Sequence, residues 1–397
     1  MFANRYLQKS KNFKWIEDIP DPDTRIIVVI PCFMEPEIIN TLESLVKCDL
    51  PPCSTEVIIL INHSVISKEE VRLYNQKTAM EADDWIRNNQ RKNLRFFVEG
   101  PVEFPSKWAG VGVARKRGMD NAVRRFNFLN RPEGIIVSLD ADTIVEKNYL
   151  TAIFDHFLNS PADVGAVISF EHQTENLEGR HLQGILLYEK YLAYYRRALR
   201  FSGYPHSIFT IGSAFAVRAD AYVKRGGMSR RQAGEDFYFL QNLVHLGNVG
   251  EISATTVHPS ARLSDRVPFG TGPVLNKWMR YEEDLSKTYN FNSFCDLREF
   301  FRIRKKLFRI TEAEYHIYIN TLPESIRNFI IEENFQDELD DLNKNCSTLK
   351  TFDIRFFQKF NAFKILKYLN YAHTNYYEKA ELDSQTGLLN LSLQRFS

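Results

Sequence analysis

Short apolar runs rich in β-branched residues constrain the fold of this chain more than any other feature of its sequence. They are continuous rather than alternating, and polar or turn-forming residues bound them. Runs of this kind are typical of strands buried on both faces of a parallel sheet. Four segments fit the description: 25–33 (RIIVVIPCF), 56–64 (EVIILINHS), 94–100 (LRFFVEG) and 134–143 (GIIVSLDADT).

Helical patterns separate these runs. Residues 35–48 carry apolar side chains at helical spacing, and residues 109–130 read as another helix. Strands that alternate with helices predict βαβ units, and hence a twisted, mostly parallel sheet with helices on its faces. In such sheets ligands bind beyond the carboxyl ends of the strands.

The pattern divides the chain into three parts. Residues 1–24 form a lead-in, residues 25–275 form the predicted α/β domain, and residues 276–397 are predicted to be helical. Within the last part, residues 294–309 interleave basic and aromatic side chains. This stretch fits either an amphipathic helix on an anionic membrane or a packing helix with a solvated basic face.

Bulk properties bear on partners and location. The formal net charge of +1 gives no electrostatic case for nucleic-acid binding. The five cysteines show no CxxC spacing, which argues against a disulfide framework or zinc ribbon and fits a reducing compartment. The first residues lack the apolar stretch of a signal peptide, and no window approaches the roughly 18 apolar residues of a membrane span. We therefore expect a cytoplasmic protein, with peripheral contact to the inner face of the membrane left open.

Two aspartates separated by one residue follow the run at 134–139. Asp140 and Asp142 stand where the strand ends, so both carboxylates can reach one side of a divalent cation. Mg²⁺ and Mn²⁺ prefer oxygen ligands and keep places for water and substrate phosphates. The alternative is an acidic triplet in a solvated loop.

A second acidic pair opens an apolar helix. Glu235 and Asp236 follow Gly234, where acids also serve as ordinary helix-capping groups. Alternatively the two carboxylates divide catalytic work: Asp236 accepts a proton from an acceptor hydroxyl, and Glu235 orients the base or the acceptor.

Positive charge gathers ahead of the aspartate pair. Residues 101–131 contain seven Lys or Arg and two acids, a local excess that suits a bound diphosphate. The arginines farther along the helix fit a solvated face. The better candidates lie near the preceding loop: Lys107, Arg115 and Arg117.

The order of these motifs resembles the inverting, family-2 type of GT-A glycosyltransferase over about residues 25–265. Each motif is short, and their order and spacing together are far more specific than any one. The resemblance rests on Ile30-Pro31-Cys32-Phe33, Gly110 with Ala114-Arg115, Asp140 with Asp142, Gly212-Ser213-Ala214, and Gly226-Gly227 ahead of Glu235-Asp236.

The resemblance implies a GT-A (Rossmann-like) fold with a helical C-terminal extension. It also implies roles for individual residues. Asp140 and Asp142 would hold Mn²⁺ or Mg²⁺ and the donor diphosphate, and Asp236 would be the general base. His258 would be a further metal ligand, or else a structural histidine. The residues expected to border the nucleotide and its phosphates are Pro31, Phe33, Glu35, Gly110, Arg115 and Arg262.

Residues 264–272 resemble a flexible loop that closes over the donor, the alternative being a plain surface loop. The sequence also departs from the family pattern. Phe33-Met34-Glu35 stands where Tyr-Asn-Glu is common, and Ile61-Asn62 stands where an acidic pair usually reads the nucleobase. Asn62 can hydrogen-bond a base edge but carries no charge. Uridine is therefore only the default base.

The implied activity is that of a metal-dependent hexosyltransferase. It moves a sugar from a nucleotide sugar to an acceptor and inverts the configuration at the anomeric carbon. The acceptor is a glycan, a lipid-linked molecule or a small molecule, and cell-surface glycan synthesis is the expected setting. Three alternatives stay open: a retaining GT-A transferase, a nucleotidyltransferase, and a non-catalytic protein that binds sugar nucleotides or acts as a scaffold. The lost acidic pair favours the last, and the intact aspartates argue against it.

Overall fold

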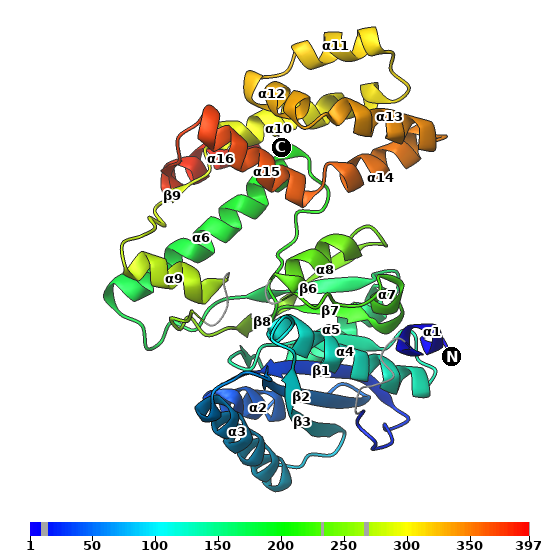
Figure 1. The fold of residues 1–397 in the computed structure, drawn as a ribbon, viewed down its shortest axis with the longest axis vertical. Helices are drawn as coiled ribbons and strands as arrows, with labels where there is room; N and C mark the ends of the chain where they lie inside the picture. Colours follow the sequence, from blue (N-terminus) through cyan, green and yellow to red (C-terminus); the bar gives the residue numbers. More distant parts are fainter. Residues whose placement is uncertain (9–14, 232–233, 266–269, 397) are drawn as a thin grey trace. The chain divides into compact units, whose positions relative to one another are not determined.

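The computed structural model describes all residues except 9–14, 232–233, 266–269 and 397. The chain forms two compact units (Figure 1). The first contains residues 1–178 and 210–276, and the second contains residues 179–209 and 277–397. Residues 179–209 thus group with the C-terminal helices, and the domain limits expected from the sequence remain predictions.

The first unit is built on an eight-stranded sheet in the order β3-β2-β1-β4-β7-β6-β8-β5. β1 pairs in parallel with β2 and β4, β2 with β3, and β6 with β8, whereas β7 and β5 run antiparallel to their neighbours. The mostly parallel α/β sheet expected from the sequence is therefore confirmed. The strands are β1 (Thr24–Cys32), β2 (Ser54–Ser64), β3 (Leu94–Phe104), β4 (Ile135–Ser138), β5 (Ile144–Val145), β6 (Gly165–Phe170), β7 (Phe215–Arg218) and β8 (Val249–His258).

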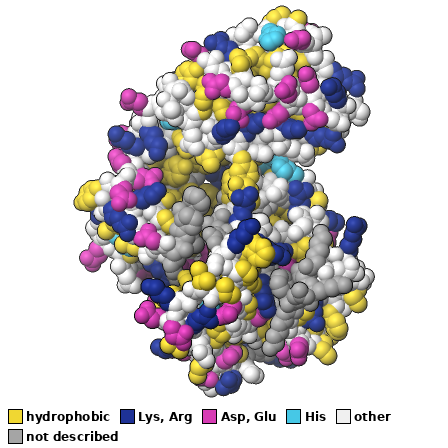
Figure 2. Space-filling model, viewed as in Figure 1, with side chains coloured by type: hydrophobic (Ala, Val, Ile, Leu, Met, Phe, Trp, Pro, Cys, Tyr) yellow, Lys and Arg dark blue, Asp and Glu magenta, His cyan; other side chains and the backbone are white. Residues whose placement is uncertain are grey.

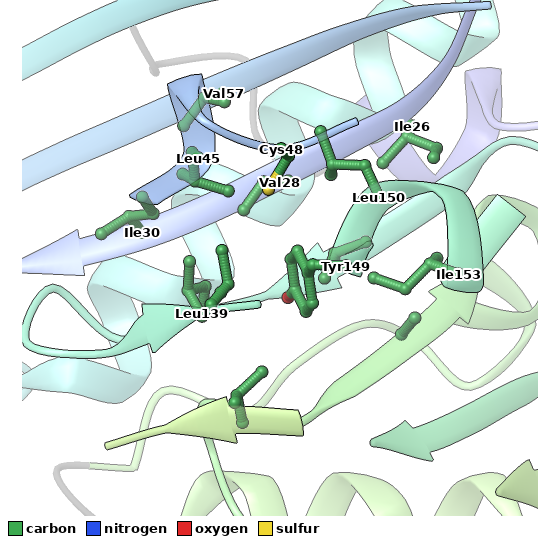
Figure 3. Packing of buried hydrophobic residues seen from close by; sticks show 14 of the residues in the cluster. Ile26, Val28, Ile30, Leu45, Cys48, Val57, Leu139, Tyr149, Leu150 and Ile153 are labelled. Atoms are coloured by element: carbon green, nitrogen blue, oxygen red, sulfur yellow. The ribbon is translucent and has the colours of Figure 1, made fainter. Parts of the chain in front are cut away.

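Helices bury both faces of this sheet. The other elements of the unit are α1 (Asn4–Leu7), α2 (Ile38–Val46), α3 (Glu69–Asn88), α4 (Val111–Phe128), α5 (Tyr149–Asn159), α7 (Ala219–Lys224), α8 (Glu235–Leu243) and the start of α9 (Thr271–Met279). Alternate residues of a strand point to opposite faces. Val28 therefore packs among side chains of α2 and α5 (Figure 3), while Val29 faces α4. A Cβ at Gly118 would collide with Val29, so glycine there lets α4 approach β1 closely.

β1 contains most of the apolar run at 25–33, and its burial accounts for that pattern. Ile26 to Ile30 are all fully buried. Each such side chain contributes about 1.5–3 kcal/mol relative to an exposed one. The strand that ends at the candidate site is thus held by a continuous run of buried side chains.

The second unit is helical, with one two-stranded ribbon. Its elements are α6 (Gly179–Ser202), the end of α9, β9 (Lys287–Thr288), α10 (Phe291–Ile303), the 3-10 helix Arg304–Leu307, α11 (Glu312–Asn320), α12 (Glu324–Glu332), α13 (Phe335–Asn345), α14 (Leu349–Lys359), α15 (Ala362–Asn375), β10 (Ala380–Glu381) and α16 (Leu382–Phe396). Phenylalanines form much of its interior: Phe300 packs edge-on or tilted against Phe335, Phe356 and Phe360.

The basic-aromatic stretch at 294–309 belongs to this interior. Phe294, Leu297 and Phe300 are fully buried, so the packing alternative describes the apolar side of α10. On the face of the molecule seen in Figure 2, basic and acidic side chains are interspersed. Contact of this stretch with a membrane remains a prediction. Among the described residues, no helix is both long and apolar enough to cross a bilayer.

Candidate active site

The predicted metal-binding aspartates follow β4 directly. Leu139 and Ala141 are buried in the core beside the sheet, so the alternating backbone turns Asp140 and Asp142 away from it. The Ser138 hydroxyl donates to the Gly212 carbonyl at 2.6 Å and fixes the end of β4 against the residues before β7. The pair therefore lies at the carboxyl end of a central strand, as expected for a ligand site in such a sheet.

One arginine joins the two acidic motifs. Arg115, in the first turns of α4, is 2% exposed and donates to both Asp140 and Glu235. The Glu235 side chain is equally buried. The guanidinium lies among the carboxylates, where it offsets their mutual repulsion. Contact of Arg115 with a nucleotide remains a prediction.

Asp236 lies beside the same guanidinium. A Cβ on Gly212 would stand 2.8 Å from Arg115 Nη2 and 3.1 Å from Asp236 Oδ2, so all three groups meet at one spot. Gly234, with φ of +70°, turns the chain into α8, and the Phe237 N–H donates to Asp236 Oδ1 at 2.7 Å. Burial raises the pKa of Asp236 and of Glu235 above their usual ranges, and Arg115 opposes this shift. A raised pKa makes a carboxylate a better proton acceptor.

A second arginine holds the other aspartate. Arg262, in the segment after β8, forms a bidentate ion pair with Glu35. Its Nη2 also lies 3.0 Å from Asp142 Oδ2. Glu35 is 4% exposed. Burial, and then the charges of Asp140 and Glu35, raise the pKa of Asp142 to about 7 against the opposing effect of Arg262.

These residues fit a divalent cation in their chemistry. Mn²⁺ and Mg²⁺ take carboxylate oxygens, and a cation would relieve the repulsion that raises the pKa of Asp142. No group of three or more His, Cys, Asp or Glu suited to a metal occurs in the described part of the chain. Asp140 and Asp142 would be the residues that hold such a cation, and its binding here remains a prediction.

His258 lies at the end of β8 and pairs with Ile144 of β5, which follows Asp142 by two residues. Its ring is directed elsewhere: Nδ1 is 3.1 Å from the Glu171 carbonyl, and Nε2 is 3.9 Å from Glu146 Oε1. The structure does not gather this ring with the two aspartates. Metal ligation by His258 remains a prediction that requires the ring to leave these partners.

Gln173 was not identified from the sequence. Its side-chain amide donates to the carbonyls of Asp142, at 3.0 Å, and His258, at 2.7 Å. It therefore ties the aspartate loop to the end of β8. A lone glutamine after a strand carries no pattern that would have revealed this role.

The ends of β1 and β2 form the expected nucleotide side of the site. Pro31 is buried and pairs with Leu60, while the Phe33 ring is 37% exposed. Asn62, 2% exposed, lies near the end of β2. Contact of these residues with a nucleotide remains a prediction.

Asn75 of α3 clamps this region and was also missed. Its side chain is fully buried, accepts from the Met34 N–H and donates to the Asn62 carbonyl, both at 2.9 Å. Met34 has a left-handed backbone (φ 46°), which is uncommon for a residue with a side chain. Asn75 thus stabilises the strained turn that leads from β1 to Glu35.

Most of the positive charge at 101–131 serves the fold. Arg117 pairs with Glu99, and Arg125 pairs with Glu56, both partners being buried or nearly so. Arg124, Arg125 and Arg131 also donate to backbone carbonyls of the lead-in, at Ile16, Asp18 and Pro22. Arg117 is therefore not available to a diphosphate. Lys107, ahead of Gly110 and α4, is exposed and remains a candidate.

The chain has matches among family models and among solved structures. The model of glycosyl transferase family 2 matches residues 27–226. Among solved structures, S. aureus TarS 1–349 is 14% identical, with 84% of this chain and 88% of that one covered and a TM-score of 0.39. Its complex with UDP-GlcNAc is 14% identical, with 85% of this chain and 92% of that one covered and a TM-score of 0.41. The mannosyltransferase PcManGT from Pyrobaculum calidifontis, in complex with GDP-Man and Mn²⁺, is 13% identical. The match covers 94% of this chain and 93% of that one, with a TM-score of 0.39.

No curated protein sequence matches the chain. The structural likenesses are too distant to carry an argument about substrates. The family match ends before Glu235, so the acidic pair of α8 lies outside it. The matched segment nevertheless spans just over half of the 397 residues, and the chain therefore belongs to glycosyl transferase family 2.

Proposed function

We propose that this chain transfers a sugar from a nucleoside diphosphate sugar to an acceptor hydroxyl by a single inverting displacement, with Asp236 as the general base. One observation carries the proposal. Asp140 and the Glu235-Asp236 pair come from distant parts of the chain and meet around Arg115 at the carboxyl end of the sheet. An isolated capping group or solvated triplet does not need such an arrangement.

Each carboxylate has a distinct task in this mechanism. Asp236 removes the proton of the attacking hydroxyl, for which its raised pKa suits it. Glu235, held by Arg115, keeps the start of α8 in place. Asp140 and Asp142 would hold Mn²⁺ or Mg²⁺, which when bound offsets the negative charge of the departing diphosphate.

The donor and acceptor are proposed by class. A UDP-sugar is the first donor to test, and Asn62 can hydrogen-bond a base edge without selecting by charge. Pro31, Phe33, Lys107 and Gly110 complete the proposed donor side. The acceptor is a glycan, a lipid-linked molecule or a small molecule, and a setting in cell-surface glycan synthesis near the cytoplasmic face of the membrane rests on the family resemblance alone.

Calorimetric titration with a panel of nucleoside diphosphates, with and without Mn²⁺, tests the donor site. We expect one nucleotide to bind in a metal-dependent manner, and Asp142→Ala to abolish the metal dependence. Transfer to a mixed acceptor extract, with the anomer of the product determined by NMR, tests inversion. A retained anomer would contradict the role of Asp236, and binding without any transfer would favour the non-catalytic alternative.

A further inference from the structure

Arg262 is shared between two carboxylates of different character. Glu35 is buried and accepts from both terminal nitrogens of the guanidinium, whereas Asp142 forms an ion pair with it, at 3.0 Å between Oδ2 and Nη2. The Arg262 side chain is 26% exposed and that of Asp142 is 21% exposed. Both side chains of this ion pair are thus partly open to solvent.

Glu35 is the fixed member of this trio. It follows the left-handed turn at Met34, which Asn75 clamps from α3, and its own carboxylate also accepts from the Glu37 N–H at 3.1 Å. Arg262 lies on a segment beyond the end of β8. The geometry therefore makes Glu35 a residue that positions Arg262.

Asp142 is the carboxylate for which two cations compete. In the proposed function Asp142 binds a divalent metal, and in the structure it pairs with the guanidinium of Arg262. Two positive groups on one carboxylate repel each other, and partial burial strengthens that repulsion. A guanidinium fork fits a phosphate as well as it fits a carboxylate. A diphosphate in the site would therefore offer Arg262 another partner and leave Asp142 to the metal.

We propose that Arg262, positioned by Glu35, is a counter-cation that competes with the divalent metal for Asp142, and that a bound diphosphate relieves this competition. Metal and diphosphate then bind cooperatively, because each favours the arrangement in which Arg262 has left Asp142. This inference rests on the proposed function, since it requires a donor site at the aspartate pair.

Mn²⁺ binding, followed by the EPR signal of the free ion, tests the competition without an activity assay. For Arg262→Met without nucleotide, we expect Mn²⁺ affinity to rise on the order of tenfold, and added UDP to raise it by a smaller factor than in wild type, because only direct contact of the phosphates with the metal remains. For Glu35→Gln, we expect Mn²⁺ affinity without nucleotide to fall, because Arg262 loses its pair with Glu35 and is left to Asp142. Arg262→Lys keeps the charge without the fork and should lie between wild type and Arg262→Met.

The opposite signs separate this role from a structural one. If Arg262 only supported the fold, both variants would weaken Mn²⁺ binding, and that result would overturn the proposal. Arg302→Met, which removes an exposed pair with Glu299, is the matched control and should leave Mn²⁺ binding unchanged. Thermal unfolding of each variant establishes that it is folded.

Failure of the proposed function gives a different result. If neither wild type nor Arg262→Met binds Mn²⁺ in the presence of UDP, the donor site itself is refuted, and the competition with it. If wild type binds Mn²⁺, Asp142→Ala does not, and Arg262→Met matches wild type, the donor site stands and only the competition is overturned.

Discussion

Arg115 donates to Glu235 across 120 positions of the sequence, and both side chains are 2% exposed. Arg115 also holds Asp140, so a single buried guanidinium connects the end of β4 to the start of α8. The metal-binding and proton-accepting parts of the proposed mechanism are therefore placed by the same ion-pair network. Four of the five predictions below concern this network or the carboxylates beside it.

Arg115→Met should destabilise the protein strongly. Removing one partner of a buried ion pair typically costs about 3–5 kcal/mol, because the remaining charges are left uncompensated. Here Glu235 and Asp140 would both lose their partner. Urea denaturation should show this loss, whereas Arg124→Met, which removes a bond to the Ile16 carbonyl, should cost no more than about 1.5 kcal/mol. Equal losses in the two variants would mean that the network does not stabilise the fold.

Asp236→Asn should abolish transfer and leave donor binding largely intact. General base catalysis contributes about 10²–10⁴-fold, so kcat should fall by at least about 100-fold. The amide has nearly the shape of the carboxylate, and nucleotide affinity measured by calorimetry serves as the control. A variant that retains most of the wild-type kcat would show that another group removes the proton.

Gly212→Ala should impair turnover more than nucleotide binding. The added Cβ would lie 2.8 Å from Arg115 Nη2 and 3.1 Å from Asp236 Oδ2, closer than these groups tolerate. We expect kcat to fall by about tenfold or more, since misplacement by about 1 Å costs up to 10²-fold. Gly387→Ala is the matched control, because nothing lies within 4 Å of a Cβ there. The prediction fails if the two variants are equally active.

The parts of the fold that follow from local pattern were predictable. β1, β2 and β4 are continuous apolar runs because both faces are buried, and the aspartates follow β4 because polar residues end such a run. The basic segment at 101–131 was less informative than its charge suggested. Its arginines find partners in β2, β3 and the lead-in, and no local pattern specifies partners so distant in sequence.

The polar residues that brace the site were likewise beyond sequence reasoning. Gln173 and Asn75 each bridge two backbone segments, and they do so as single residues without a motif. The direction of a ring is also a tertiary property. The partners of the His258 imidazole depend on Glu146 and Glu171, which lie on other segments of the chain.

Asn75→Ala should weaken nucleotide binding through the turn at Met34. The variant removes the hydrogen bonds of Asn75 to the Met34 N–H, which is partly buried, and to the Asn62 carbonyl, which is buried, at a cost of about 0.5–1.5 kcal/mol each in stability. Because the turn then loses its clamp, we expect the dissociation constant for UDP with Mn²⁺ to rise several-fold. Asn88→Ala, which removes an exposed bond to the Asp84 carbonyl in the same helix, should leave it unchanged. Wild-type UDP affinity in a folded Asn75→Ala protein would contradict this role.

Metal binding should depend on pH through Asp142. Burial raises the pKa of this carboxyl to about 7 in the metal-free protein, well above its usual value, so the folded state favours the protonated form. The metal-free protein should therefore lose stability through this group as pH rises from about 4 to about 7, and should lose no more above that range. Because a metal ligand must be deprotonated, Mn²⁺ must displace this proton at low pH.

The affinity for Mn²⁺ in the presence of UDP should accordingly fall by about tenfold per pH unit below 7 and level off above it. Calorimetry in buffers with different ionisation enthalpies should register about one proton released per Mn²⁺ at pH 5.5 and close to none at pH 8.5. Asp142→Asn cannot titrate, so its unfolding free energy in EDTA should lack the decline that Asp142 causes between about pH 4 and pH 7 in wild type. Equal proton release at the two pH values would show that Asp142 is already ionised in the metal-free protein, and that Arg262 offsets its burial more fully than the pKa of about 7 implies.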